Sequence, residues 1–240
     1  MAAERYLIVN ADDFGQSLGV NQGVIETFEK GIVTSASLMV RWPAAADAAE
    51  YSYRHPSLSV GLHVDLGEWT CRDGAWTPVY EVSPLDDSTA VAQEVARQLA
   101  AFRRLLGRNP THIDSHQHVH RDKPARGILS AVARQLGVPL RDCHPNVRYC
   151  GDFYGQTGNG VSCPDAIAMG ALVKILKALP SGVTELACHP GKGDDIDSMY
   201  RSERGEEVTS LCHPQVRSTL LTEAIELRSF GNLPVVPNIA

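Results

Sequence analysis

Short apolar runs alternate with amphipathic segments along the chain, and this alternation restricts the possible folds more than any other feature. The apolar runs are rich in β-branched residues and are predicted as strands at 5–11, 34–40, 58–66, 111–117, 138–143 and 183–189. Segments with helical periodicity follow them at 20–31, 44–53, 88–107, 122–136, 164–179 and 214–228. Repeated strand–helix units imply parallel strands with right-handed crossovers, which form either an α/β barrel or an open sheet.

The composition limits the partners and the compartment that we expect. Of the 240 residues, 43% are hydrophobic, and no linker interrupts the pattern, so a single domain spanning 1–240 is predicted. A net charge of −6 without a Lys/Arg cluster argues against nucleic acid or an anionic membrane as the main partner. No apolar run is long enough to span a bilayer. The six cysteines form no C-x-x-C pair and the N-terminus lacks an apolar signal core, which together predict a cytoplasmic protein with reduced thiols.

The segment THIDSHQHVH, at 111–120, holds four of the nine histidines of the chain. Because alternate residues of a strand share a face, His112, Asp114 and His116 are predicted to point the same way. Polar residues also occur at the ends of three other predicted strands. Asp12 and Asp13 follow the strand at 5–11, His63 and Asp65 lie in the strand at 58–66, and His189 ends the strand at 183–189. Catalytic groups of β/α barrels gather at the C-terminal ends of the strands, so these side chains are expected to meet in one site.

Each of these residues also has a structural interpretation. Paired aspartates after a strand often form a turn or a helix cap, and a lone histidine in an apolar strand is often part of the core. Burying several polar rings without purpose is costly, so we interpret the histidine-rich segment as containing at least one metal ligand. Imidazoles and carboxylates without thiolates are typical of a catalytic site, and they suit Zn²⁺ better than Mg²⁺, which prefers oxygen ligands.

Five sequence blocks resemble those of the YdjC-like carbohydrate deacetylases, which include the chitooligosaccharide deacetylases. The blocks are LIVNADDFG, GIVTSASLMV, VGLHVDL, PTHIDSHQHVH and ELACHPG, and they occur in the order of the family. The resemblance implies a distorted, TIM-like β/α barrel with about seven parallel strands. It also implies one divalent metal ion, held by one aspartate and two histidines, and hydrolysis of the N-acetyl group of an amino sugar or a short oligosaccharide.

The resemblance implies a role for individual residues. The second aspartate of ADD, Asp13, corresponds to the metal-binding carboxylate, and the histidines of GLH and DSH, His63 and His116, to the other two ligands. Asp12 is then the candidate general base, by similarity to the paired aspartates of polysaccharide deacetylases, and His189 is the candidate general acid. We expect Zn²⁺ at this site on the basis of ligand type, with Mg²⁺ as the alternative.

The remaining residues of the cluster are expected to support the site. A ligating imidazole normally has its second nitrogen held by another group, and Asp114 could hold one. His118 and His120 are expected to support the ligands or to contact the substrate. Two segments, 67–87 and 143–163, match no block of the family, and the first of them is expected to be an irregular insertion. The segment 191–207 is interpreted as a charged, solvated loop.

Two other functions are compatible with the same residues. His-x-Asp and His-x-His patterns also occur in metal-dependent phosphoesterases on similar barrels, usually with more than one ion. A catalytically inactive protein that binds sugar or metal is the second alternative, although the presence of Asp12 beside all three expected ligands argues against it. A homodimer is the default expectation for the oligomeric state.

Overall fold

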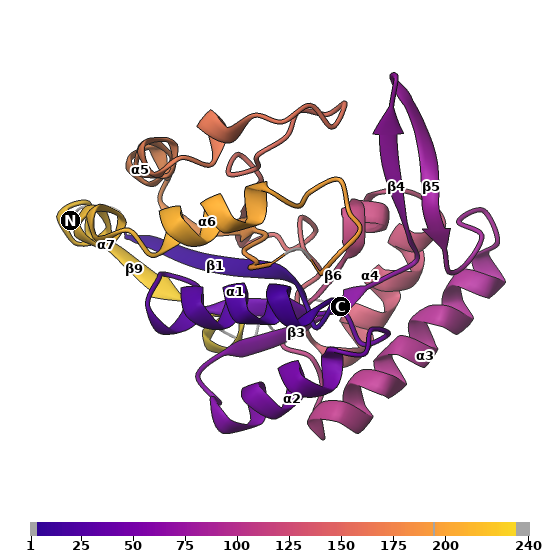
Figure 1. Ribbon diagram of the computed structural model, residues 1–240. Helices are drawn as coiled ribbons and strands as arrows, with labels where there is room; N and C mark the ends of the chain where they lie inside the picture. The colour runs from indigo at the N-terminus through magenta and orange to yellow at the C-terminus, as the bar shows by residue number, and fades with distance from the viewer. Residues whose placement is uncertain (1–3, 194, 234–240) are drawn as a thin grey trace.

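A seven-stranded parallel sheet forms the centre of the computed structural model, which describes residues 4–193 and 195–233 (Figure 1). Its strands follow the order β6-β3-β2-β1-β8-β7, and β9 also pairs with β1. The strands are β1 (Arg5–Phe14), β2 (Ser35–Leu38), β3 (Ser59–Val64), β6 (Ile113–Ser115), β7 (Val147–Cys150), β8 (Gly182–Cys188) and β9 (Ile225–Arg228). This architecture confirms the predicted distorted β/α barrel.

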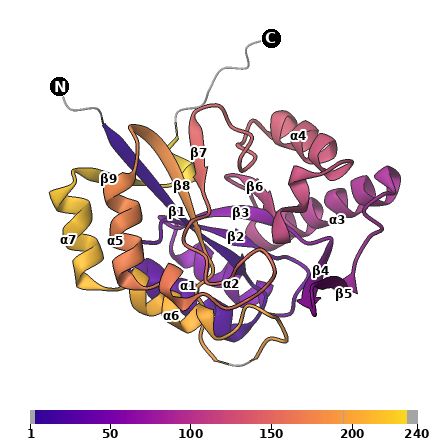
Figure 2. The same cartoon turned by 90° about the horizontal axis from the view of Figure 1, so that it is seen from above.

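Helices surround the strands, as Figure 2 shows from above. They are α1 (Leu18–Glu29), α2 (Ala45–Arg54), α3 (Ser88–Leu106), α4 (Ala125–Leu136), α5 (Met169–Ala178), α6 (Glu203–Leu211) and α7 (Pro214–Thr222). The described residues also form three short 3-10 helices: η1 (His116–Arg121), η2 (Pro164–Ala166) and η3 (Phe230–Asn232). No helix in the described ranges is long and apolar enough to cross a membrane.

The sheet curls but does not close into a complete barrel. The prediction of a strand at 138–143 is wrong, because this segment forms only a single β-bridge, between Leu140 and Ile113 of β6. Pro139 has no backbone N–H to donate, and Asp142 has a left-handed φ of 56°, so a ladder cannot extend in either direction. The next strand, β7, lies in the segment 143–163 and pairs only with β8 among the described strands.

The C-terminal part of the prediction is also corrected. The last helix was expected to run to 228, but α7 ends at Thr222, and Ala224 has a φ of 50° that reverses the chain into β9. β9 pairs with Arg5–Ile8 of β1, whereas β2 pairs with the second half of β1, from Asn10 onward. The expected loop at 191–207 contains the beginning of α6.

The segment 67–87 is not irregular as expected, because it forms an antiparallel hairpin. Its strands are β4 (Gly67–Arg72) and β5 (Ala75–Glu81), which stand away from the central sheet in Figure 1. The following helix, α3, begins where predicted, and its N-cap is Asp87, whose side chain accepts from the N–H groups of Thr89 and Ala90.

Polar residues replace apolar ones on the inner face of the barrel beneath the carboxyl ends of the strands. Along β1, Leu7, Val9 and Ala11 belong to the hydrophobic core, whereas Asn10 points to the other face and donates to the Ser37 hydroxyl of β2 at 2.8 Å. Ser37 in turn donates to Asp114 of β6 at 2.6 Å. Three strands are thus linked by a buried hydrogen-bond network that lies directly under the predicted site.

Candidate active site

A β-bulge at the end of β1 brings two consecutive aspartates to the same site. In a regular strand, Asp12 and Asp13 would face opposite sides of the sheet. The register of β1 with β2 shifts between Ala11 and Phe14, and Asp13 has a left-handed φ of 64°. Both carboxylates are buried and line the same cavity. A non-glycine residue in this conformation is strained, and such strain is typical of functional positions.

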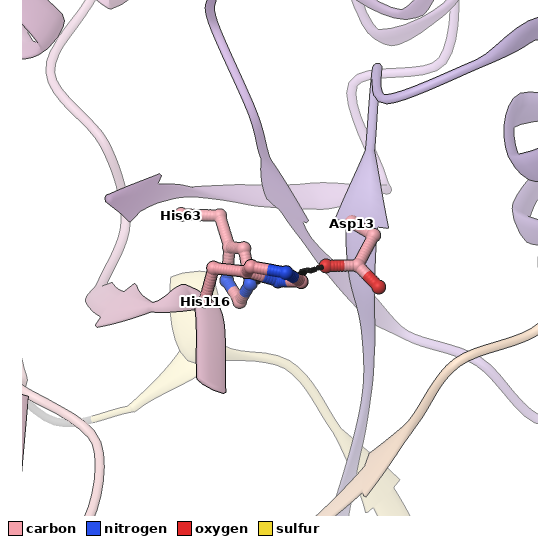
Figure 3. Close-up of side chains that lie close together, drawn as sticks. All are labelled: Asp13, His63 and His116. Atoms are coloured by element: carbon pink, nitrogen blue, oxygen red, sulfur yellow. Dashed lines mark hydrogen bonds and ion pairs between the residues drawn. The ribbon is translucent and has the colours of Figure 1, made fainter. Parts of the chain in front are cut away.

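The side chains of Asp13, His63 and His116 converge from β1, β3 and the first residue after β6 (Figure 3). His63 Nε2 lies 3.2 Å from Asp13 Oδ1, and His116 Nδ1 lies 3.0 Å from the same oxygen. The three potential ligand atoms all lie within 4.8 Å of one another, and the three residues are buried. The structure therefore brings together the three residues that the family resemblance assigns to the metal.

His63 has a carboxylate beside each of its ring nitrogens. Its Nδ1 lies 2.8 Å from Asp114 Oδ1, on the side opposite Asp13. Burial opposes protonation, but Asp114 and Asp13 outweigh it and raise the pKa of His63 to about 10. The ring therefore carries either a second proton or a cation next to Nε2. The contact with Asp114 is the support that a ligating imidazole requires.

His116 has a carboxylate near each of its ring nitrogens, Asp13 at Nδ1 and Glu68 at Nε2. Its Nε2 is buried without a hydrogen-bond partner among the described residues, and the Glu68 carboxylate is 3.6 Å away. Burial again opposes protonation, but Asp13 and Glu68 raise the pKa of His116 to about 9. Two imidazoles and one carboxylate around one buried point form a donor set that suits a divalent ion, and Zn²⁺ in particular.

Asp12 is held by a fully buried arginine. Arg141 donates from Nη1 to Asp12 Oδ2 at 2.6 Å and from Nη2 to Asp12 Oδ1 at 2.7 Å. It also lies 2.9 Å from Asp114 Oδ2 and donates to Glu185 Oε1 at 2.6 Å. Burial disfavours the charged form of Asp12, but the guanidinium outweighs it and lowers the pKa of this carboxyl below its usual value. Asp12 is therefore ionised at neutral pH.

His189 follows β8 and faces Asp12 across the site. Its Nε2 lies 3.7 Å from Asp12 Oδ2, and its backbone N–H donates to Glu207 Oε2 of α6 at 2.5 Å. Burial lowers the pKa of His189 to about 4, so the ring is neutral at pH 7. A neutral imidazole must first gain a proton before it can act as a general acid.

The other residues of the histidine-rich segment lie in different surroundings. The strand predicted at 111–117 is only β6, because Gln117 and His118 have left-handed φ values of 48° and 57°. His118 is half-buried, lines the cavity and lies 3.0 Å from the Tyr149 hydroxyl through Nε2. His120 is fully buried and pairs through Nδ1 with the Ser115 hydroxyl at 2.7 Å. His112 stacks on Phe230, beneath the site.

A cavity of about 520 Å³ opens onto these residues. Its walls contain Asp12, Asp13, His63, His116 and His189, together with six aromatic side chains: Trp69, Trp76, Tyr149, Phe153, Tyr154 and Tyr200. All of these aromatic residues except Tyr200 come from the two segments that match no block of the family, 67–87 and 143–163. These segments therefore form part of the wall around the site, and the volume accommodates a small organic ligand.

The similarity of the chain to known proteins shows the family to which it belongs. The model of the YdjC-like protein family matches residues 6–222. The chain belongs to the YdjC-like family. It is 32% identical to a carbohydrate deacetylase of Geobacillus stearothermophilus, over 94% of this chain and 97% of that protein. It is 33% identical to a chitooligosaccharide deacetylase of Serratia marcescens, over 96% of this chain and 100% of that protein.

Solved structures show the same architecture as this YdjC-like chain. A candidate cellobiose-phosphate cleavage protein of Enterococcus faecalis V583 superposes with a TM-score of 0.78 and 26% identity, over 95% of this chain and 98% of that one. A family 4 carbohydrate esterase of Streptomyces lividans, in complex with acetate, has a TM-score of 0.60 and 13% identity, over 98% of each chain. At that identity, the second similarity concerns the fold alone.

Four charged residues of the site in this YdjC-like chain were not anticipated from the sequence. Arg141 and Glu185 stand in the apolar runs VPLRDC and VTELACH, where a charged residue in a predicted buried strand was the available signal. Arg204 and Glu207 are three residues apart on one face of α6, a spacing that indicates a shared helix face. Arg204 donates from Nη2 to Asp13 Oδ2 at 2.7 Å and so occupies the oxygen that the histidines leave free.

Proposed function

We propose that this YdjC-like protein is a metal-dependent carbohydrate deacetylase that hydrolyses the N-acetyl group of an amino sugar or a short oligosaccharide and releases acetate. The observation that carries the proposal is the convergence of Asp13, His63 and His116 in a buried cluster beside Asp12 and His189. The deacetylases among the relatives support the same reaction class. The aromatic walls of the cavity support a sugar as the ligand, because sugar rings pack on flat apolar faces.

Asp13, His63 and His116 are proposed to hold one divalent ion, with Zn²⁺ favoured by the donor set and Mg²⁺ as the alternative. When bound, such an ion polarises a carbonyl group and lowers the pKa of water from about 15.7 to about 7. Arg204 supports this arrangement, because it bonds to Asp13 Oδ2 and leaves Oδ1 directed at the two imidazoles. Asp114 fixes the orientation of the His63 ring through Nδ1.

Asp12 is proposed as the general base that takes a proton from the attacking water. A carboxylate has about four lone-pair positions, two on each oxygen. Asp12 Oδ1 accepts from both Arg141 and Asn10, whereas Oδ2 accepts only from Arg141 among the described donors. Oδ2 therefore retains a position for the proton. It is also the oxygen that faces His189.

His189 is proposed to deliver that proton to the departing amine. Its Nε2 lies 3.7 Å from Asp12 Oδ2, so a proton held there has a short path to the imidazole. Because the pKa of His189 is lowered to about 4, the protonated ring is a strong acid and releases its proton readily to the amine nitrogen. In this sequence, Asp12 loads His189 and returns to its ionised form.

The charge distribution favours one ion over the two expected of a phosphoesterase. A second group of potential ligands, Asp12, His63 and Asp114, also lies within 4.8 Å. Both of its carboxylates already contact the Arg141 guanidinium, at 2.6 Å and 2.9 Å, so a positive charge is present without a metal ion. This arrangement supports the deacetylase over a two-metal hydrolase.

The single-domain organisation, the cytoplasmic location and the homodimer stay predictions.

Acetate release is the measurement that tests the proposed function. The protein is stripped with a chelator, reloaded with one equivalent of Zn²⁺, and incubated with N-acetylated mono- and oligosaccharides and with sugar phosphates. We expect acetate from at least one N-acetylated sugar, no activity before reloading, and loss of activity in Asp13→Asn. Release of phosphate without acetate, or a requirement for two ions per chain, contradicts the proposal. Binding of sugars without turnover of any of them favours the inactive alternative.

A further inference from the structure

Tyr154 occupies a rigid position on the wall of the active-site cavity. It lies between β7 and η2, in the segment 143–163, and its side chain is 37% exposed. Phe153 before it is buried. Gly155 after it donates its backbone N–H to the Tyr200 hydroxyl at 2.8 Å. A Cβ at Gly155 would lie 2.7 Å from Glu203 Cγ, so only glycine lets the chain approach α6 this closely.

The ring of Tyr154 is fixed in two directions. One face stacks on Tyr200, with ring centroids 4.6 Å apart and an interplanar angle of 11°. Its ring also meets His189 nearly edge to face, with centroids 5.4 Å apart and an angle of 67°. Tyr200 is itself anchored, because its hydroxyl donates to Glu207. The Tyr154 ring is therefore held beside the candidate general acid without any contribution from its own hydroxyl.

The hydroxyl of Tyr154 has no hydrogen-bond partner among the described residues, although Tyr149 and Tyr200 in the same region both have one. Burial raises the pKa of Tyr154 above its usual value, and the nearby negative charges of Asp13 and Glu207 raise it further. The phenol therefore stays protonated at all pH values at which a hydrolase would work. It is an uncommitted hydrogen-bond donor that lines the same cavity as the Asp13 cluster.

We propose that the Tyr154 phenol donates a hydrogen bond to the acetamide oxygen of the substrate as that oxygen gains negative charge. This inference rests on the proposed deacetylation. Attack of water on an acetamide turns the carbonyl oxygen into an oxyanion, and a donor already fixed at that place lowers the barrier without reorganisation. The stack with Tyr200 and the pinned Gly155 supply this fixation. Tyr154 thereby becomes a catalytic residue in a segment that contains none of the five sequence blocks.

The substitution Tyr154→Phe tests this role, because it removes the hydroxyl and keeps the stacked ring. We expect kcat to fall on the order of 100-fold, which is typical of the loss of one oxyanion donor, with a much smaller change in KM. Zn²⁺ content, Zn²⁺ affinity and melting temperature are expected to match the wild type. Tyr53→Phe, at a side chain of α2 that is 84% exposed, controls for the substitution itself and is expected to retain full activity.

A second variant, Tyr154→Leu, separates the hydroxyl from the ring. If the ring only offers a face for a sugar, Tyr154→Phe keeps the wild-type kcat while Tyr154→Leu raises KM, and this result overturns the proposal. An unchanged kcat in both variants overturns it as well. A wild-type protein that releases no acetate refutes the deacetylase function, and the role of Tyr154 falls with it. An active wild type with an unaffected Tyr154→Phe variant refutes the role of Tyr154 alone.

Discussion

Asp114→Asn is expected to weaken metal binding without changing any of the three candidate ligands. Asp114 Oδ1 pairs with His63 Nδ1 at 2.8 Å, while Oδ2 accepts from Ser37 at 2.6 Å and contacts Arg141 Nη2 at 2.9 Å. Both oxygens therefore face donors. An amide has only one acceptor oxygen, so its NH₂ group must point at a donor on one side or the other. Asparagine at 114 cannot hold His63 and also keep its contacts with Ser37 and Arg141.

The magnitude follows from these contacts. Loss of the group that orients a ligating histidine typically lowers metal affinity by about 10- to 100-fold, which is about 1.4 to 2.7 kcal/mol. The folded protein is also destabilised, because breaking a buried ion pair costs about 3 to 5 kcal/mol. Arg141 keeps Asp12 and Glu185 as partners, so we expect the lower end of that range. Metal binding and stability should therefore both decrease, and neither should be abolished.

Competition with a coloured chelator measures the Zn²⁺ affinity, and thermal unfolding with and without Zn²⁺ measures the stability. Asp86→Asn, at an exposed position before α3, is the matched control and should behave as the wild type. The reasoning is refuted if Asp114→Asn folds and binds Zn²⁺ with wild-type affinity. In that case the contact with His63 Nδ1 would not contribute to holding a metal ion.

Three further predictions follow from the charges of the site. Asp12→Asn should lower kcat by about 10²- to 10⁴-fold while Zn²⁺ binds normally, as measured by acetate release and metal titration, and full activity would exclude Asp12 as the base. The pKa values of about 10 for His63 and about 9 for His116 mean that both rings are protonated at pH 7 without an ion. Zn²⁺ should therefore displace about two protons, so that its affinity rises with pH up to about 10. Calorimetry in buffers of different ionisation enthalpy would detect the released protons, and their absence would contradict the assignment. Burial raises the pKa of Glu207 from 4.5 to about 8, so its contribution to stability is complete below pH 4.5 and lost as the pH rises through 8. Glu207→Gln should not show this loss. If the melting temperatures of the wild type and the variant change in parallel from pH 5 to 9, Glu207 is not the group responsible.

The sequence was informative where local pattern and local structure agree. The apolar runs before Asp12 and around His63 predict buried strands, and the barrel rule then places polar residues at their ends on one rim. The pairing of Asp13 with those residues could not be predicted from alternation, because the bulge and the left-handed φ at Asp13 depend on the register with β2. The assignment of that residue came from the family resemblance.

Other parts of the site depend on contacts between distant segments. Arg141 is fully buried because three carboxylates from different strands neutralise it, and nothing within VPLRDC specifies those partners. The first residues of α6 are as highly charged as the loop before them, so the sequence pattern predicts that they are solvated. Arg204 is nevertheless buried, because Asp13 lies opposite it. The strand β9 was missed because the apolar spacing of the preceding helix continues past Ala224.

The shared edge of β1 has a consequence for the order of folding. One side of this strand is completed by β2 in its second half and by β9 in its first half, where Arg5 pairs with Ile225. During synthesis, the backbone of Arg5–Ile8 therefore stays open on that side until residues 225–228 have emerged. The central strand of the barrel is thus fully paired only through contact with a segment far from it in the sequence, and pairing between such distant segments is a slow step of folding.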